Sequence, residues 1–116
     1  MLANADQHAP IMKTIDIARD FTKYPAGRVL DDGPFSGERF RKDFLEPIIR
    51  SGEHAVISFD GAIGYGSSFL EEAFGGLVRE CGYNPKAVLD AFDLNSSDES
   101  LVAEITDYIN NAVKDG

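Results

Sequence analysis

Several features that mark other protein classes are missing from this chain. A single cysteine, Cys81, excludes an internal disulfide. No apolar run approaches the ~20 residues that span a bilayer, and the first ten residues lack the basic and then apolar pattern of a secretory signal. Basic residues are few, because 11 Lys and Arg stand against 20 Asp and Glu, for a net charge of −9. These absences favour a cytoplasmic protein that binds neither a membrane nor nucleic acid directly, since the phosphate backbone would be repelled.

The residue types that usually carry metal or nucleophilic chemistry are also scarce. His8 and His54 show no spacing with cysteine that is typical of a zinc site. Cys81 falls on the apolar side of an expected helix, which predicts a buried structural thiol rather than a nucleophile. No histidine is placed to activate a serine in a pattern typical of hydrolases. We therefore predict a non-enzymatic protein without a metal or a cofactor.

Apolar residues recur at the spacings of both strands and helices, which predicts an α/β domain. Residues 13–18 alternate and suggest a half-buried first strand, and residues 28–30 suggest a short second strand in a hairpin with it. The apolar run of residues 55–59 is typical of a buried central strand. Residues 88–94 suit a final edge strand, or a segment that begins as a helical turn at Pro85.

Three amphipathic helices are expected among these strands. The first starts at Ser36, and Pro47 inside it predicts a kink or a break near Leu45. The second starts at Ser68 and the third at Ser96, each with a glutamate three residues later, as in a capping box. Each helix therefore has a start signal of its own.

The length of 116 residues suits one domain with one core. We expect an α/β fold in which a small mixed sheet of about four strands is packed with about three helices. This domain covers residues 11–113, with a flexible N-terminal segment at 1–10 and a C-terminal tail at 114–116. The adjacent glycines Gly75 and Gly76 inside the second helix predict close packing against another backbone, either in this domain or across a homodimer interface.

A glycine-rich turn between the central strand and the second helix is the most informative segment. It reads GAIGYGSS over residues 61–68, and its three glycines allow backbone shapes that other residues resist. The turn matches neither G-x-G-x-x-G nor the Walker A motif, which both bind nucleotides. Ser67 and Ser68 stand at the expected helix start, where the positive end of the helix dipole favours a phosphate, either bound or covalently attached.

Another helix start carries the most basic part of this acidic chain. Its residues are Arg28, Ser36, Gly37, Arg39 and Arg41, which could hold an anion. The arginines could equally pair with the aspartates and the glutamate beside them. Both interpretations stay open at the level of the sequence.

Two blocks, SGERFR at residues 36–41 and SSFLEEAFGGL at residues 67–77, resemble the bacterial STAS-like family of unknown function, and the resemblance extends over most of the chain. It implies a small α/β domain related to the STAS fold of anti-sigma-factor antagonists. In those antagonists a strand ends in an Asp-Ser-Ser-Gly turn, whose second serine is phosphorylated by a kinase-type anti-sigma factor. By position, Ser68 is the implied phosphoacceptor and Ser67 its neighbour, with Gly66 in place of the aspartate and Phe69 in place of the glycine.

The leading hypothesis is a regulatory protein–protein interaction module that docks through residues 61–69 and the helix after them. The resemblance implies a histidine-kinase-like ATPase as the partner and serine phosphorylation as the switch. One alternative is a small nucleotide- or anion-binding domain, and another is an acidic inhibitor of a nucleic-acid-binding protein. The candidate partner- or anion-binding residues are Asp60, Gly61, Gly64, Tyr65, Gly66, Phe69, Glu72, Arg28, Ser36, Gly37, Arg39 and Arg41.

Overall fold

The computed structural model describes residues 12–112, so the predicted N-terminal segment and C-terminal tail lie outside the described residues. One sheet contains three strands in the order β1 (Met12–Asp16), β2 (His54–Ser58) and β3 (Phe92–Asn95). All three run parallel, and Ile57 of β2 lies between Ile15 and Leu94. β2 is the central strand, as its apolar run predicted.

The predicted mixed sheet of about four strands was wrong, because the described residues form three strands that are all parallel. Residues 28–30 do not pair with β1, and the chain turns there in a 3-10 helix, η2 (Leu30–Asp32). The Asp32 carboxylate accepts hydrogen bonds from the N–H groups of Arg28 and Val29 at 2.9 and 3.0 Å. It thereby takes the donors that a strand ladder would need. Without a hairpin, the chain passes from β1 to β2 through helices, and such a crossover makes the strands parallel.

Helices make up most of the remaining described residues. Their elements in chain order are η1 (Ile17–Phe21), α2 (Gly37–Phe40), η3 (Arg41–Leu45), α3 (Glu46–Ser51), α4 (Ser67–Leu70), η4 (Glu71–Gly75), α5 (Gly76–Arg79), α6 (Pro85–Ala91) and α7 (Glu99–Asn111). α2, η3 and α3 follow one another without a gap, as do α4, η4 and α5. The turns η1, η3 and η4 are π-helical, so each of the two long helices widens in its middle.

The widening in the first long helix lies directly before its proline. The N–H of Glu46 donates to the carbonyl of Arg41, five residues earlier. Pro47 has no N–H and lies inside this continuous helix, directly after the π-helical turn and Glu46. The helix does not break near Leu45, because α2, η3 and α3 are continuous, and a π-helical turn ends there instead.

Both predicted capping boxes were wrong. The helix after the glycine turn begins at Ser67, because the extended backbone of an N-cap falls on Gly66, which has no side chain to cap it. The last helix begins after Asp98, whose carboxylate accepts a hydrogen bond from the N–H of Ser100 at 3.0 Å. Ser68 therefore lies inside the first helical turn, and Ser96 lies before α7.

α6 and β3 share the segment that the sequence left open between a strand and a helical turn. The Asn84 side chain accepts a hydrogen bond from the N–H of Ala87 at 2.8 Å, and Pro85 occupies the first turn of α6. β3 then follows at once as an edge strand of the sheet. Both alternatives are therefore realised, one after the other.

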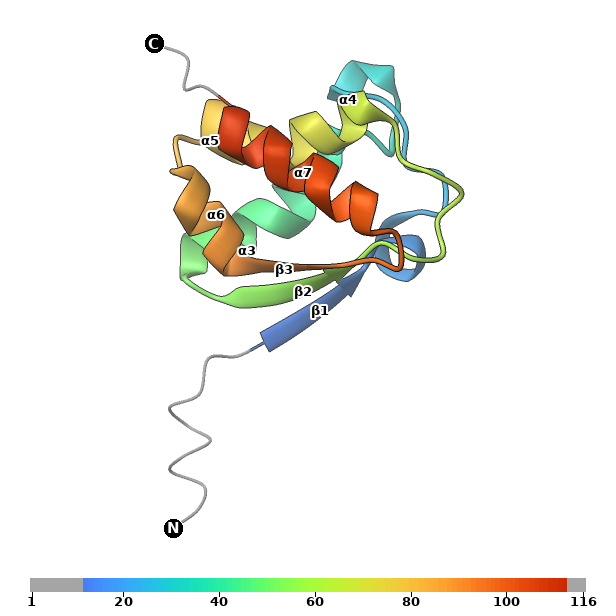
Figure 1. The fold of residues 1–116 in the computed structure, drawn as a ribbon. Coiled ribbons are helices and arrows are strands. Elements are labelled where there is room, and N and C mark those ends of the chain that lie inside the picture. The colour runs from blue at the N-terminus through green and yellow to red at the C-terminus, as the bar shows by residue number, and fades with distance from the viewer. Residues whose placement is uncertain (1–11, 113–116) are drawn as a thin grey trace.

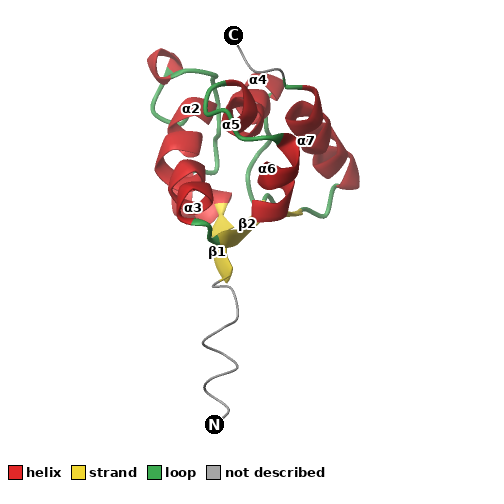
Figure 2. Cartoon of the chain, turned by 90° about the vertical axis from the view of Figure 1, so that its left-hand side faces the viewer, coloured by secondary structure: helices red, strands yellow, loops and turns green. Residues whose placement is uncertain are grey.

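The helices cover one face of the sheet and leave the other face open, as Figures 1 and 2 show. Side chains alternate accordingly, since Ile15 and Ile57 are buried while Thr14 and Asp93 are exposed. Parallel sheets usually have both faces covered, and polar residues on the open face here replace the usual apolar runs. Among residues 12–112, no helix has the length and apolar character needed to cross a bilayer.

The core between sheet and helices is rich in phenylalanine. Phe40, Phe69 and Phe74 are fully buried. The ring centroid of Phe40 lies 6.0 Å from that of Phe69 and 6.4 Å from that of Phe74. Glycines bring the surrounding helices close together, because a Cβ on Gly75 would lie 3.4 Å from the carbonyl oxygen of Tyr108 in α7. The close backbone packing predicted for this glycine is confirmed within the chain.

Candidate functional site

The helix start at Ser36 is closed by contacts within the chain. Ser36 is buried, and its hydroxyl accepts a hydrogen bond from the N–H of Arg39 at 3.2 Å. The N–H groups of Gly37 and Glu38 donate at 2.9 Å to backbone carbonyls of residues 27 and 28. A Cβ on Gly37 would overlap the carbonyl oxygen of Phe69, so the two long helices touch here. The donors that an anion would need at this start already have partners.

Behind this start, three arginines and three glutamates form a charged cluster between the two long helices. Its members are Arg28, Arg41, Arg79, Glu46, Glu71 and Glu72. Arg41 and Glu72 are both buried, and Nη1 of the arginine lies 2.6 Å from Oε2 of the glutamate. The cluster joins η3 to η4, the π-helical turns of the two helices. Two candidate binding residues, Arg41 and Glu72, are therefore paired with each other.

Gly76 makes room for this cluster. A Cβ at this position would overlap the Arg41 guanidinium, whose Cζ would lie at 3.2 Å. Arg41 also donates through Nε to Glu46 Oε2 at 2.9 Å and through Nη1 to the carbonyl of Glu72 at 2.9 Å. Burial lowers the pKa of Arg41, but the carboxylates of Glu72 and Glu46 outweigh it, so the net shift is upward. The guanidinium thus stays charged inside the protein.

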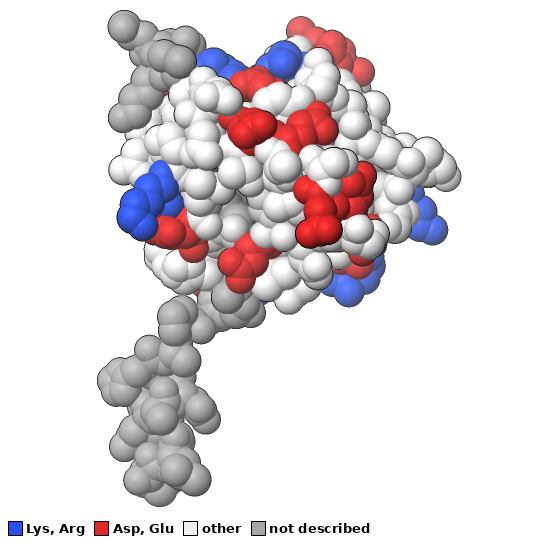
Figure 3. All heavy atoms as spheres, viewed as in Figure 1, with Lys and Arg blue, Asp and Glu red and all other residues white. Residues whose placement is uncertain are grey.

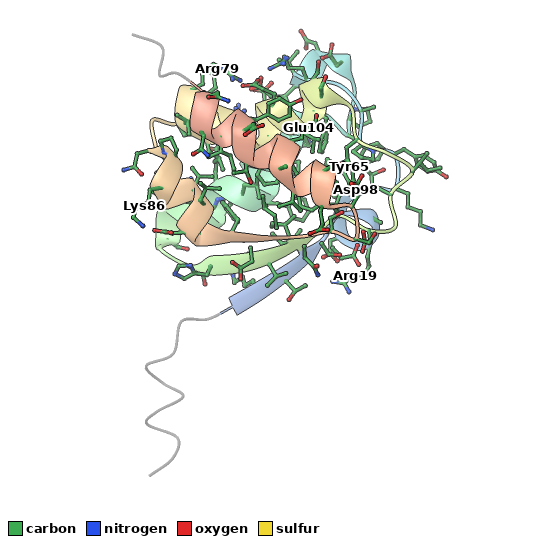
Figure 4. The ribbon with its side chains drawn as sticks, in the orientation of Figure 1. Arg19, Tyr65, Arg79, Lys86, Asp98 and Glu104 are labelled. Carbon is green, nitrogen blue, oxygen red and sulfur yellow. The ribbon has the colours of Figure 1, made fainter. Side chains whose placement is uncertain are left out.

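The glycine turn extends beyond the carboxyl end of β2 and is held at three points. Asp60 accepts hydrogen bonds from the N–H and the hydroxyl of Ser97, both at 3.0 Å. Tyr65 donates to the carbonyl of Phe59 at 2.7 Å, and burial raises its pKa. Ile63 donates through its N–H to the carbonyl of Lys23 at 2.9 Å. Figure 4 shows Tyr65 at the end of the molecule where Asp98 precedes α7, opposite the end that carries Lys86.

The three glycines of this turn differ in their roles. Gly61 has a positive φ of +100°, which favours glycine, and its Cβ would lie 3.1 Å from that of Ala18. A Cβ on Gly64 or Gly66 would meet no atom within 4 Å. Only Gly61 is therefore needed for the shape of the turn.

Ser67 and Ser68 are both exposed in the first turn of the second long helix. Ser67 lies beside Tyr108, whose hydroxyl donates to Glu104 Oε2 at 2.5 Å, and this bond is the main reason why the pKa of Tyr108 is raised. Ser68 stands three and four residues before Glu71 and Glu72. Phe69, in contrast, is fully buried in the core. The two serines are therefore exposed to solvent, and the buried side chain of Phe69 holds this helical turn against the core.

Five large exposed apolar side chains lie on two loops, residues 22–36 and 60–66, and the second loop leads directly to these serines. Ile63 is 77% exposed and Tyr24 is 64% exposed. We call this set the two-loop surface, and its members are Tyr24, Val29, Leu30, Phe35 and Ile63. Hydrogen bonds join it, because Ile63 binds Lys23 and the N–H of Ala26 donates to the carbonyl of Phe35 at 3.1 Å. Figure 1 shows both loops side by side, at one end of the sheet near the start of α4.

Sequence reasoning missed the two-loop surface. Tyr24, Phe35 and Ile63 stand alone between glycines and prolines, in KYPAG, GPFSG and GAIGYG, whereas Val29 and Leu30 lie in the segment that was predicted to be a strand. Phe35 contacts Phe21, which packs against the core, with the two ring centroids 5.7 Å apart. Isolated apolar residues inside turn-forming segments were the signal that could have found this surface.

The C-terminal part of the described chain is acidic, in contrast to the apolar two-loop surface. Residues 87–112 contain neither Lys nor Arg, and their acidic residues are Asp90, Asp93, Asp98, Glu99, Glu104 and Asp107. Figure 3 shows acidic side chains spread over the face that α7 forms, with Lys and Arg near its margins. The molecule therefore has an acidic face next to the two-loop surface.

Cys81 is exposed, which corrects the prediction of a buried thiol. The helix ends at Arg79, so the apolar stripe that would have buried the cysteine stops before it. Partial burial and a contact with Glu46 at 3.4 Å raise the pKa of Cys81 to about 11. Residues 12–112 contain neither a pocket nor a group of His, Cys, Asp and Glu side chains that could hold a metal ion.

A family model described as a STAS-like domain of unknown function (DUF4325) matches residues 36–99. The chain belongs to this family. The match runs from Ser36, through both long helices and the glycine turn, to Glu99 at the start of α7. Neither a curated protein nor a solved structure matches the chain. The predicted family and α/β class of this STAS-like domain are confirmed.

The two blocks that carry the resemblance meet in the structure of the STAS-like domain. Gly37 and Arg41 of the first block contact Phe69 and Glu72 of the second. Their part in the fold is to bring the two long helices together around a buried ion pair. The segment of the two-loop surface that contains Tyr24 and Phe35 precedes the matched residues.

Proposed function

We propose that this STAS-like domain is a non-enzymatic regulatory module that docks onto a protein partner through residues 61–68 and the two-loop surface. The observation that carries this proposal is the exposure of Ile63 on the glycine turn, directly before the exposed serines at the start of α4, and of further apolar side chains on residues 22–36. Large exposed apolar side chains on neighbouring segments are typical of a protein interaction site. Ile63 lies at the centre of the docking segment, on the turn itself.

The partner class that the family resemblance implies is a histidine-kinase-like ATPase, with Ser68 as the phosphoacceptor and Ser67 as the neighbouring candidate. In that reaction the γ-phosphoryl group of ATP moves to the serine oxygen, the hydroxyl proton is released, and ADP leaves. The exposure of both serines supports this proposal, because a kinase can reach them without unfolding the helix. A phosphate adds about −1.5 to −2 charges beside Glu71 and Glu72, and so alters the docking surface electrostatically.

The test is an affinity pull-down from the native host with mass spectrometry of the partner and the bait. Ile63→Asp should lose the partner, because a charge would be buried in an apolar contact. Ala103→Asp adds the same charge at an exposed position of α7 and should retain it. Equal recovery by the two variants would count against docking at the turn.

Phosphorylation has a separate readout in the same experiment. Bait phosphorylated at Ser67 or Ser68 would support the switch, and Ser68→Asp should then weaken the complex while the fold stays intact. If Ser68→Asp binds the partner as well as the wild type does, the switch is refuted while the docking site stands.

A second candidate function is an acidic inhibitor of a nucleic-acid-binding protein, and the acidic face over residues 87–112 favours it. Such an inhibitor would bind a basic partner through α7 rather than through the turn. Binding should then weaken steeply as salt rises, because exposed charges are screened. Binding that does not depend on salt would argue against this function.

A further inference from the structure

Arg28 connects the loop of residues 22–36 to the second long helix. Its Nη1 lies 2.6 Å from Oε1 of Glu71 and 3.1 Å from Oε1 of Glu72. The next residue, Val29, is a member of the two-loop surface. A side chain from the loop that carries part of this surface is therefore bound to the helix that begins with the two exposed serines.

Ser68 stands one helical turn before both of these glutamates. The N–H of Glu71 donates to the carbonyls of Ser67 and Ser68, and the helix widens only from Glu71 onward. Residues three and four positions apart share a face of a helix, and their side chains lean toward its N-terminus. Glu71 and Glu72, together with the Arg28 guanidinium that binds them, therefore lie on the side of the helix to which Ser68 belongs.

The three arginines of the charged cluster differ in their access to solvent. The side chain of Arg28 is 39% exposed, against 19% for Arg79 and 4% for Arg41. Arg79 also binds both Glu71 and Glu72, with its Nη2 2.9 Å from Oε1 of Glu72. Arg28 is thus the arginine that a group at the surface reaches most easily, and the two glutamates keep a cationic partner when it leaves them.

We infer that Arg28 is the receptor, within this chain, for a phosphate on Ser68. The γ-phosphoryl group of ATP moves to the serine Oγ, whose proton is released as ADP leaves, and the guanidinium transfers from Glu71 and Glu72 to the phosphate. A phosphate carries about −1.5 to −2 charges and accepts bidentate hydrogen bonds from arginine, so it competes with the carboxylates. This inference rests on the proposed function, namely that Ser68 is phosphorylated, and it specifies how the modification acts.

The transfer carries the modification from the helix to the neighbouring loop. The N–H groups of Arg28 and Val29 both donate to the Asp32 carboxylate, so the turn that contains Val29 and Leu30 is tied to Arg28. When the guanidinium moves to the phosphate, this turn moves with it. Phosphorylation therefore changes the shape of the two-loop surface as well as its charge.

The test uses the full chain with phosphoserine incorporated at position 68 during translation. The second pKa of the phosphate, ordinarily about 6, is measured by phosphorus NMR in the wild-type background and in Arg28→Gln. A guanidinium in contact with the phosphate favours the dianion, so this pKa should be lower by about one unit when Arg28 is present. Equal values in the two proteins would overturn the inference.

A matched substitution controls for net charge. Arg50→Gln removes an exposed arginine in the last turn of α3 and should leave the pKa of the phosphate unchanged. If Arg50→Gln raises this pKa as much as Arg28→Gln does, the effect is one of net charge and the inference is overturned.

A second readout needs no substitution and therefore holds even if Arg28→Gln does not fold. The amide signals of Val29 and Leu30 are compared by NMR in the wild-type chain with serine or phosphoserine at position 68. We expect both signals to shift, because their turn is tied to Arg28. Unchanged signals at both residues would contradict the transfer.

The result is distinguishable from a failure of the proposed function. If bait from the native host carries a phosphate at Ser68 but the pKa of that phosphate does not depend on Arg28, the proposed modification stands and the inference fails. If the captured partner does not depend on Ile63 and neither serine carries a phosphate, the proposed function itself fails, whatever Arg28 does in the protein with incorporated phosphoserine.

Discussion

At Ser36 a helix starts inside the protein with its early N–H groups already bonded, whereas at Ser67 a helix starts in solvent with no side-chain cap. Both starts combine serine, glycine and nearby charges in the sequence. The two starts differ in the packing around them. Gly37 lets the first start pack against the second helix, whereas a Cβ on Gly66, directly before Ser67, would meet no atom within 4 Å. The first start is packed inside the fold, and the serines of the second start are exposed to solvent.

The largest difference in stability should come from substitutions of the arginines that follow the helix start at Ser36. Arg41→Met should cost about 3 kcal/mol in the free energy of unfolding, because Oε2 of buried Glu72 loses its partner while Arg28 and Arg79 still bind Oε1. Arg39→Met changes an exposed side chain and should stay within about 0.5 kcal/mol. Urea unfolding followed by circular dichroism measures both. Similar losses in the two variants would show that Arg41 is not held as the structure describes.

A smaller effect should come from the glycines. Gly37→Ala places a methyl group against the Phe69 carbonyl and 3.1 Å from the Cβ of Glu72, so we expect a loss of about 1–3 kcal/mol. Gly64→Ala places the same group where no atom lies within 4 Å, and should be neutral or stabilising by up to about 1 kcal/mol. The thermal unfolding midpoints of the two variants should therefore move in different directions. A large loss for Gly64→Ala would mean that the turn is packed rather than open.

The serines provide the third comparison. Ser36→Ala removes an N-cap hydrogen bond inside the protein and should cost about 0.5–2 kcal/mol. Ser68→Ala removes an exposed hydroxyl that caps nothing, and should change stability by less than about 0.5 kcal/mol. The sequence alone predicted that Ser68 caps its helix. A loss at Ser68 as large as that at Ser36 would restore that prediction.

Much of this fold was predictable because its signals are local. The apolar run of β2 predicted the central strand. Glycine at position 75 predicted a close backbone contact, which α7 provides. Each of these signals depends on a few adjacent residues and needs no knowledge of the rest of the chain.

The wrong predictions arose where two groups compete for the same hydrogen bond or the same backbone position, or where the partner is distant in the sequence. Residues 28–30 resemble a strand, but the Asp32 carboxylate captures their donors and turns the chain. Ser68 resembles an N-cap, but Gly66 has the extended backbone that the position requires. The pairing of Arg41 with Glu72 joins residues 31 positions apart. Sequence spacing could not decide whether that arginine binds an anion or a glutamate of its own chain.

The smallest expected effect is on the pH dependence of stability. It compares Glu38, beside the helix start at Ser36, with Glu71, beside the helix start at Ser67. The N–H of Leu30 is the main cause that lowers the pKa of Glu38. Burial raises the pKa of Glu71, but hydrogen bonds from Arg28 and Arg79 outweigh it, so this pKa is lowered as well. A lowered folded-state pKa means that each carboxylate contributes stability above the unfolded value of about 4.3, and that this contribution is lost as the pH falls through the folded-state value.

Salt should distinguish the two carboxylates. Urea unfolding between neutral pH and about pH 3 should show a shallower acid dependence for both Glu38→Gln and Glu71→Gln than for the wild type. At about 1 M salt the Debye length falls to about 3 Å, so the contribution of Glu71, which depends on partly exposed arginines, should shrink. The contribution of Glu38 depends first on a backbone N–H and should persist. If salt removes both contributions equally, the two helix starts are held by the same kind of interaction, and the contrast between a closed start and an open one loses its electrostatic basis.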